Sequence, residues 1–263
     1  MTDPTPLLTV DDLAAGYDER TVLDGISFTV REGEILVVLG TSGCGKSTLL
    51  RCVVGLLPPR RGRVLIGGRD VHAARGPDRE AILRSVGMAF QGAALLNSLS
   101  VAENVALPIE EHWGLDRRTA TMLARLHLSR VGLAGAADLF PAALSGGMRK
   151  RAGLARALAL EPRLLLVDEP SAGLDPVTAR GLDDLLLELR ARARLGIVVV
   201  THELGSIQAI ADRVLMLAGG RVLAAGALDA VRQHPAPEVQ AFFARSPLPQ
   251  AGERSLLEGL GGS

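Results

Sequence analysis

A glycine-rich stretch at residues 40–48, GTSGCGKST, carries the residue types that bind a nucleoside triphosphate. Its spacing fits the pattern G-x-x-x-x-G-K-S/T, with Gly40, Gly45, Lys46 and Ser47 at the defining positions. In such a loop the backbone N–H groups surround phosphates, the lysine reaches the terminal phosphates and the hydroxyl binds Mg²⁺. The stretch therefore predicts a site for a nucleoside triphosphate with Mg²⁺.

Two adjacent carboxylates follow an apolar run in the stretch RLLLVDEP, residues 163–170. Asp168, at the end of that run, suits a Mg²⁺ ligand that acts through water. Glu169, near a terminal phosphate, would polarise a water for in-line attack. Taken alone, two carboxylates after a strand would favour a helix cap or a surface turn over a chemical role. Because the same chain carries the phosphate loop, the chemical role is favoured.

The stretch LSGGMRKRAGLARALAL, residues 144–160, predicts a second anion site. Ser145, Gly146 and Gly147 open a helix with an apolar face, so free N–H groups and a hydroxyl gather at its start. The alternative is an ordinary serine N-cap that binds no ligand.

A mostly parallel sheet is expected to position these groups. The apolar run 35–39 leads into the phosphate loop, and the helix expected after it is buried through Leu49, Leu50, Val53, Val54 and Leu56. Further strands are expected at 86–91, 163–170, 197–203 and 213–217. The helical stretch 181–196 joins two of these runs in a βαβ unit. Ligands bind at the carboxyl ends of such strands, where Gly45, Asp168 and His202 fall.

The segments outside this sheet differ in pattern. Short strands are expected at 7–10 and 25–30, and Tyr17 between them either packs as a half-buried strand residue or stacks on a nucleotide base. Its position relative to the phosphate loop favours stacking. Residues 100–160 are helical in pattern, with apolar residues at three-to-four spacing at Met122, Leu123 and Leu126. From His234 onward, repeated prolines predict an irregular extension.

Composition narrows the function classes. The chain has 263 residues, of which 48% are apolar, enough for the core of one two-lobed domain. Its 29 Lys and Arg match 29 Asp and Glu, so no overall basic field favours nucleic acid, and no nucleic-acid partner is expected. Cys44 and Cys52 have neither metal-ligand spacing nor a disulfide framework, which fits a reduced cytosolic compartment. No apolar run approaches the roughly 18 to 20 residues that span a bilayer, so another chain would have to hold the protein at a membrane.

Together these stretches make the chain resemble the ATP-binding subunit of ABC transporters across roughly residues 7–230. The family's motifs occur in the family's order: the Walker A loop GTSGCGKS, a Q-loop at Gln91, the signature LSGGM, the Walker B strand LLLVDE, a D-loop ending at Asp175 and a switch histidine, His202. The resemblance implies an α/β P-loop NTPase cassette with a mostly parallel core sheet, an N-terminal antiparallel β subdomain and a helical subdomain inserted at about 95–160. It implies a cassette over residues 1–240 and a partly irregular C-terminal extension over 241–263.

The resemblance also implies ATP and Mg²⁺ as cofactors and a role for each site residue. The implied catalytic residues are Lys46, Glu169, which activates water, and His202, which contacts the γ-phosphate. The residues implied to hold ATP are Tyr17, which stacks on adenine, Gly40, Thr41, Ser42, Gly43, Cys44, Gly45, Lys46, Ser47, Thr48, Gln91, Ser145, Gly146, Gly147 and Asp175. The implied metal ligands are Ser47, Gln91 and Asp168.

The resemblance further implies partners. In the family the signature helix of one cassette covers the nucleotide on another, which implies a homodimer with ATP sandwiched between two copies. Asp175 is implied to communicate across that dimer, and Gln91 to sense both the Mg²⁺ site and transmembrane permease subunits. The implied location is the cytoplasmic face of the cell (inner) membrane, where the permease holds the cassette. Met148 departs from the family, whose signature has glutamine at this position.

Within the family, FQGAALLNSLSVAENVALPIEEH, LSGGMRKRAGLARA and DEPSAGLDP are similar to the Mla (MlaF/Mkl-type) phospholipid-transport ATPases. This similarity implies a phospholipid cargo and further lipid-transport subunits. Two alternatives remain. One is an ABC transporter ATPase for another cargo, such as an amino acid, a metal or a lipoprotein, and the other is a soluble ABC ATPase that remodels a macromolecule.

Overall fold

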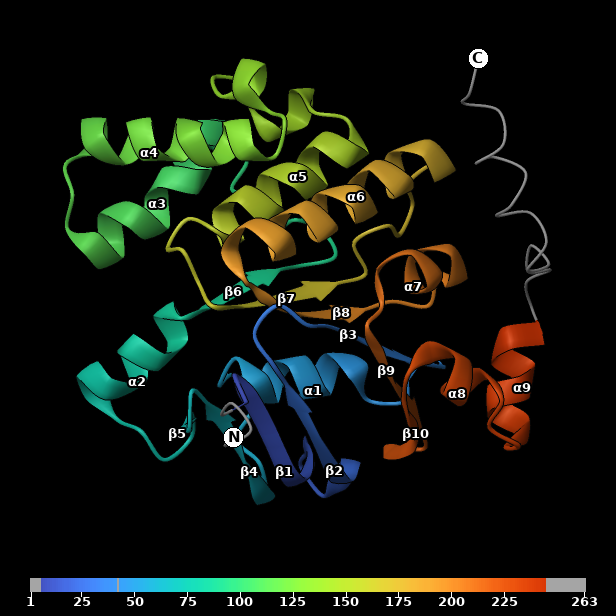
Figure 1. Cartoon of the computed structure of the whole chain (residues 1–263). Coiled ribbons are helices and arrows are strands. Elements are labelled where there is room, and N and C mark those ends of the chain that lie inside the picture. The colour runs from blue at the N-terminus through green and yellow to red at the C-terminus, as the bar shows by residue number, and fades with distance from the viewer. Residues whose placement is uncertain (1–5, 42, 245–263) are drawn as a thin grey trace, which may run out of the picture.

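A six-stranded sheet forms the centre of the chain, in the order β10-β9-β3-β8-β7-β6 (Figure 1). The computed structural model describes residues 6–41 and 43–244. The parallel strands are β3 (Ile35–Gly40), β6 (Val86–Ala89), β7 (Leu164–Asp168), β8 (Gly196–Val200) and β9 (Arg213–Ala218). The edge strand β10 (Arg221–Gly226) runs antiparallel to β9. The parallel sheet expected from the apolar runs is thus confirmed.

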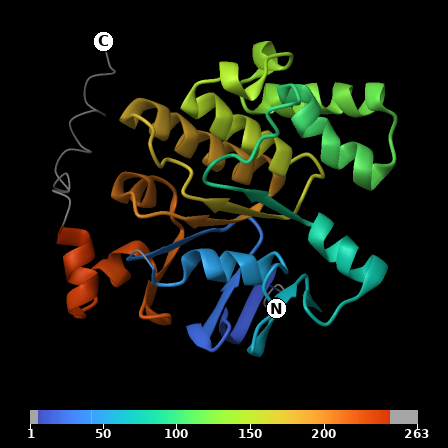
Figure 2. The same cartoon turned by 180° about the vertical axis from the view of Figure 1, so that it is seen from behind.

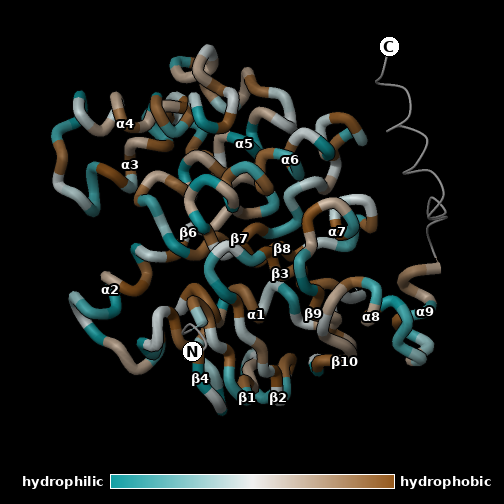
Figure 3. Tube along the Cα trace, in the orientation of Figure 1, coloured by the Kyte–Doolittle hydropathy of each residue, from teal (hydrophilic) through white to brown (hydrophobic). Residues whose placement is uncertain are grey.

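The central strands are covered on both faces, which explains their continuous apolar sequence. Every residue of β3 and β8 is buried. Ile35, Val37 and Leu39 face one hydrophobic cluster, while Leu36 and Val38 face a second cluster on the other side of the sheet. Figure 3 shows the same apolar concentration along these strands. Because the strands are parallel, their carboxyl ends, including the paired residues Asp168 and Val200, meet at one edge.

An antiparallel sheet and one helix cover the face of the core sheet that carries Leu36 and Val38. The sheet has the order β2-β1-β4-β5, and its strands are β1 (Leu8–Tyr17), β2 (Arg20–Val30), β4 (Arg61–Ile66) and β5 (Arg69–Asp70). β1 and β2 are longer than the expected strands 7–10 and 25–30, and Tyr17 is the last residue of β1. Helix α1 (Lys46–Val53) lies between the two sheets, as both views of the chain show (Figures 1 and 2).

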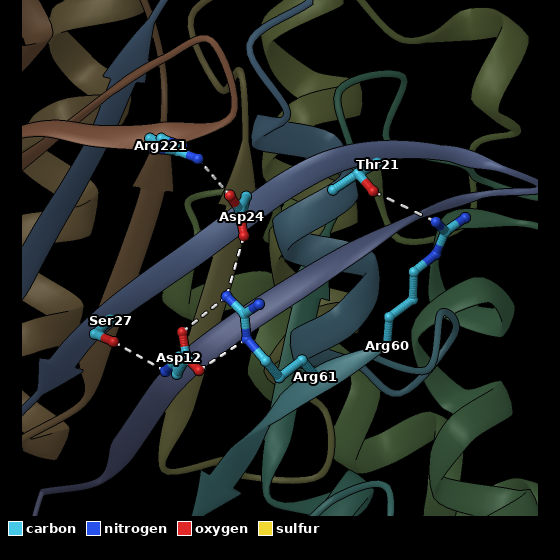
Figure 4. Close-up of polar contacts among 7 residues, drawn as sticks. All are labelled: Asp12, Thr21, Asp24, Ser27, Arg60, Arg61 and Arg221. Carbon is cyan, nitrogen blue, oxygen red and sulfur yellow. Dashed lines mark hydrogen bonds and ion pairs between the residues drawn. The ribbon is translucent and has the colours of Figure 1, made fainter.

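The burial expected along α1 is correct only in part. Leu49, Leu50 and Val53 are buried, but Leu56 is 70% exposed because the helix ends at Val53 and the chain turns toward β4. Arg61 of β4 also joins the antiparallel strands at the surface, with its guanidinium 2.8 Å from Asp12 and 3.0 Å from Asp24 (Figure 4). Arg221 of β10 binds the same Asp24, so this exposed network links the two sheets, although such pairs stabilise a fold only weakly.

Helices cover the opposite face of the core sheet (Figure 1). They are α3 (Val101–Trp113), α4 (Arg117–Arg130), α5 (Gly146–Ala157) and α6 (Pro176–Ala193), with the short 3-10 turns Ala134–Ala136 and Pro141–Ala143 between α4 and α5. The expected helical insertion is present, and Leu123 of the expected apolar stripe on α4 packs against the core, but the other two residues of that stripe do not. Met122 is 65% and Leu126 49% exposed, because α4 packs through Ala120, Ala124 and Leu128.

The remaining helices are α2 (Gly76–Arg84), α7 (Leu204–Ile210), α8 (Leu228–Arg232) and α9 (Pro237–Ala244). The irregular chain expected from His234 onward is wrong for residues 237–244, since α9 buries Val239 and Phe243 against the core. The rest of the predicted extension, 245–263, lies outside the described residues, and the domain division at residue 240 stays a prediction. Across 6–41 and 43–244, no helix has the length and apolar character needed to cross a membrane.

A buried carboxylate on α6 makes stability depend on pH. Asp183 is 4% exposed beside the buried Ser206 of α7, and Oδ1 has no hydrogen-bond partner in the described chain. Burial raises the pKa of Asp183, and the neighbouring charge of Asp184 raises it further, whereas a Ser206 hydrogen bond and the charge of Arg180 lower it. The native state therefore holds its proton to higher pH than the unfolded chain, so stability falls as pH rises from near 3.8 through the folded pKa.

We expect Asp183→Asn to raise the free energy of unfolding at pH 7 by on the order of 1 kcal/mol, the usual scale for an incompletely compensated buried polar group. At pH 3, where the carboxyl is protonated in both states, the gain should vanish. Urea denaturation at the two pH values measures both quantities. Glu188→Gln, an exposed change on the same helix, is the control and should shift stability by less than about 0.5 kcal/mol. Destabilisation by Asp183→Asn at pH 7 would show that the buried carboxylate of Asp183 does not lower stability.

Candidate functional site

The phosphate loop connects the end of β3 to the start of α1, and its backbone requires glycine. Gly40 has φ +151° and Gly45, the N-cap of α1, has φ +107°. A Cβ atom at Gly40 would lie 2.3 Å from the carbonyl oxygen of Leu217, and one at Gly45 would lie 2.4 Å from the Leu23 side chain. Only glycine therefore allows the loop to turn between the two sheets. Ser42, predicted to bind ATP, lies outside the described residues.

The lysine of the loop folds over the loop itself. Lys46 Nζ donates to the carbonyl oxygens of Gly40 at 2.8 Å and Thr41 at 3.1 Å, and lies 3.9 Å from Cys44 Sγ. Ser47 and Thr48 follow in the first turn of α1, where Ser47 is exposed and Thr48 is buried. The start of any helix is positive and presents N–H groups that its own turns do not pair, so the loop and α1 together suit an anion such as a phosphate.

Asp168 ends β7 at the same edge of the sheet, where it is half-buried. Burial raises the pKa of its carboxyl, the adjacent Glu169 raises it further, and Lys46, Lys150 and Arg51 oppose the shift. The charge of Lys46 thus acts directly on Asp168, which joins the phosphate loop and the carboxylate in one site. A partly desolvated carboxylate at the sheet edge that also holds the phosphate loop fits a hard cation that prefers oxygen ligands, such as Mg²⁺.

Glu169 has an unusual backbone and an unpaired side-chain oxygen. Its φ is +45°, a left-handed conformation that is rare outside glycine. Its N–H donates to the Val200 carbonyl at 2.8 Å, which fixes it to the end of β8. His202 Nδ1 lies 2.9 Å from Oε1, which fits the tautomer with its proton on Nδ1 because a carboxylate only accepts. Oε2 is buried and has no partner among the described residues. An unpaired buried oxygen in this position is consistent with a group that accepts a proton during a reaction.

Tyr17 lies at the end of β1 with 39% of its surface exposed. Its hydroxyl accepts a hydrogen bond from Arg51 of α1 at 2.6 Å. The Arg51 guanidinium carbon is 5.9 Å from the ring centre, near the ~6 Å limit for a cation–π contact. Tyr17 is therefore a strand residue held by its hydroxyl, with ring surface still exposed, and the stacking role stays a prediction.

The remaining predicted residues lie on two helix starts and one turn, and all of them except the half-buried Gly147 are exposed. Ser145 is the N-cap of α5, where its hydroxyl accepts from the Met148 N–H at 3.2 Å. Asp175 caps α6 by accepting from the N–H groups of Val177 at 3.1 Å and Thr178 at 3.0 Å. Within the described chain, no hydrogen bond joins Ser145 or Asp175 to the phosphate loop, Asp168 or Glu169. In the single chain Ser145 therefore acts as the N-cap of α5, which is the alternative role considered for it.

Gln91, Asp175 and Gly147 have different surroundings. Gln91 lies in the exposed turn that follows β6. Bonds from Thr178 and Val177 hold the pKa of Asp175 below its usual value. A Cβ at Gly147, which follows Gly146 in the first turn of α5, would lie 2.4 Å from the Thr178 methyl group, so the signature packs closely on α6.

Two cations that no sequence motif indicated also contact the site. Arg51 contacts Tyr17, and Lys150 Nζ donates to the carbonyl oxygen of Glu169 at 2.8 Å. In the sequence, each of them is a long cationic side chain on a helix that begins at a predicted ligand site. The sequence does not show which way each side chain turns, because charged residues on helices usually face solvent.

Known proteins resemble both the sequence and the fold. The family model described as "ABC transporter" matches residues 23–172. The phospholipid transport ATP-binding protein MlaF of Escherichia coli K12 is 38% identical over 237 residues, covering 90% of this chain and 88% of MlaF. The methionine import protein MetN of Caulobacter vibrioides is 40% identical over 260 residues, covering 97% of this chain and 76% of MetN. MetN of Rhizobium johnstonii is 42% identical, and the chain spans 63% of its length.

Solved structures agree with this assignment. CbiO1 from Clostridium perfringens, part of the cbiONQ ABC transporter complex, matches this chain with a TM-score of 0.79 and 28% sequence identity. The match covers 97% of this chain and 99% of the CbiO1 chain. The ATP-binding cassette MJ0796, solved as a dimer in a post-hydrolysis state bound to ADP and Pi, matches with a TM-score of 0.77 and 30% sequence identity. The match covers 84% of this chain and 98% of the MJ0796 chain. The chain therefore belongs to the ABC transporter family, as an ATP-hydrolysing cassette that binds ATP with Mg²⁺.

Proposed function

We propose that this chain supplies half of each of two shared ATP sites and that hydrolysis at these sites drives a transport cycle. The observation that carries the proposal is the pairing of Glu169 with His202 beside Asp168 and Lys46 at one sheet edge. The phosphate loop, residues 40–48, would hold the phosphates and Tyr17 the adenine ring. Ser47, Asp168 and Gln91 would hold Mg²⁺, which when bound neutralises charge on the β- and γ-phosphates.

Glu169, His202 and Lys46 have separate roles in hydrolysis. Glu169 accepts a proton from water through its unpaired Oε2 while the water oxygen attacks the γ-phosphorus and the bond to the β-phosphate oxygen breaks. His202 orients the carboxylate through Oε1, and it is exposed enough, at 56% of its side chain, to contact the γ-phosphate as well. Lys46 provides positive charge for the same phosphate.

The signature would act on the partner's nucleotide. Among the described residues, Ser145, Gly146, Gly147 and Asp175 have no hydrogen bond to this chain's own phosphate loop, which fits a role toward a second copy. The N–H groups at the start of α5 would then complete the anion site that the partner's loop begins. The dimeric state of the related cassette MJ0796 supports this arrangement.

A phospholipid is the cargo we favour, carried by permease and further lipid-transport subunits at the cytoplasmic face of the membrane. The support is the similarity to MlaF over 90% of this chain and the Mla-like stretches around Gln91 and Met148. Methionine import is the second candidate, since several relatives at 40 to 46% identity carry that name.

Glu169→Gln should lower the turnover number for ATP hydrolysis by ~10²- to 10⁴-fold, the usual contribution of a general base, because the amide cannot accept the proton. A phosphate-release assay at saturating ATP and Mg²⁺ measures the effect. Glu188→Gln, an exposed pair with Arg192, is the matched control and should retain turnover. Turnover of the Glu169→Gln protein within threefold of the parent would remove Glu169 from the mechanism.

The same Glu169→Gln protein should form a dimer with ATP and Mg²⁺, because nucleotide sandwiched between two copies joins them and is not consumed. Sedimentation velocity would show about twice the monomer mass with ATP and the monomer with ADP. The measurement is repeated with the co-purified permease. A monomer under both conditions would contradict the shared site.

Phospholipids should be enriched in the complex when the protein is purified with its membrane partners in mild detergent. Mass spectrometry of the retained proteins and lipids, compared with a parallel preparation from cells that lack this chain, gives the readout. A multi-spanning permease with bound methionine in place of lipid would support the second candidate. Recovery of a macromolecular complex with no permease would contradict a transport role.

A further inference from the structure

The left-handed backbone of Glu169 needs support from its surroundings. A non-glycine residue in this region is strained and persists only where neighbouring contacts hold it. On the amino side, the bond to the Val200 carbonyl holds the N–H of Glu169. On the carboxyl side, its carbonyl oxygen accepts from the Ala172 N–H at 3.3 Å and from Lys150 Nζ at 2.8 Å. The shorter of these two bonds comes from another element, helix α5.

The Lys150 ammonium reaches this carbonyl through a closely packed region. Lys150 and Asp168 line a cavity of about 10 Å³ together with apolar side chains that include Phe90 and Leu154. A water needs at least about 10–15 Å³, so little room remains for a solvent molecule to replace the ammonium group. Burial lowers the pKa of Lys150, while the charges of Glu169 and Asp168 oppose that shift. The contact is thus a partly desolvated, charge-assisted hydrogen bond, a class stronger than exposed pairs.

We propose that Lys150 is a positioning residue for ATP hydrolysis, which fixes the Glu169 carbonyl and thereby the direction in which the Glu169 carboxylate points. The side chain follows the backbone turn, and a rotation of that turn would move Oε2 away from the attacking water. Lys150 itself bonds the backbone and touches no reacting atom, so its effect passes through Glu169. The inference rests on the proposed role of Glu169 as general base.

Lys150→Met is the first test, because methionine keeps most of the volume and removes the donor. We expect the turnover number to fall about 10-fold, which corresponds to about 1.4 kcal/mol. The KM for ATP and the affinity for a fluorescent ATP analogue should stay within twofold, since Lys150 does not bind nucleotide. Lys150→Arg, which can still donate to the carbonyl, should recover at least half of the parent turnover.

Arg151→Met provides the matched structural control on the same helix. Arg151 donates to the carbonyls of Val131 at 3.1 Å and Gly181 at 2.8 Å, away from Glu169. Its loss should lower Tm without the selective loss of turnover. Circular dichroism and Tm are recorded for every variant, so that a folding defect is recognised.

The decisive comparison combines Lys150→Met with Glu169→Gln. Because Lys150 acts through Glu169, the double variant should be no slower than Glu169→Gln alone. Several results would overturn the proposal: unchanged turnover in Lys150→Met, a raised KM with unchanged turnover, no recovery in Lys150→Arg, equal loss in Arg151→Met, or additive loss in the double variant. Near-normal turnover of Glu169→Gln alone would instead refute the proposed role of Glu169, which separates the two failures.

Discussion

The backbone turn at Glu169 is the constraint on which the geometry of the site depends. A strand that continued beyond Asp168 would direct successive side chains to opposite faces of the sheet. The left-handed residue ends β7 at that point and leaves Asp168 and Glu169 as neighbours with different surroundings. Asp168 remains close enough to Lys46 for their charges to interact, while Glu169 is bonded to His202. One backbone dihedral angle thus separates a carboxylate suited to metal from one suited to proton transfer.

The core sheet fixes the rest of the site because its strands are parallel and buried on both faces. The carboxyl ends of β3, β7 and β8 lie at one edge, which brings together segments that are far apart in the sequence. The two hydrophobic clusters on its faces prevent any slip in register, since a shift of one residue would exchange the faces of every side chain. A rigid base of this kind suits a site that must hold phosphates and a metal in fixed relative positions.

Helix α5 connects the halves of the proposed shared site within one chain. Its first turn carries the signature, capped by Ser145, and Lys150 further along it bonds the turn at Glu169. Arg156 near its end donates to the carbonyls of Ala93 and Ala94, which follow Gln91 and both have positive φ. The signature, the turn at Glu169 and the turn that contains Gln91 are therefore all attached to α5.

The sequence by itself determined the phosphate loop, the parallel strands, the helical insertion and the family. These features depend on local residue types and spacing: glycines where φ is positive, and apolar runs where a strand is covered twice. The tertiary structure alone decided which surfaces are covered. It left Met122, Leu126 and Leu56 exposed, formed a helix over 237–244, and turned Lys150 toward a backbone carbonyl. Burial and side-chain direction depend on neighbours contributed by distant segments, and no local pattern specifies those neighbours.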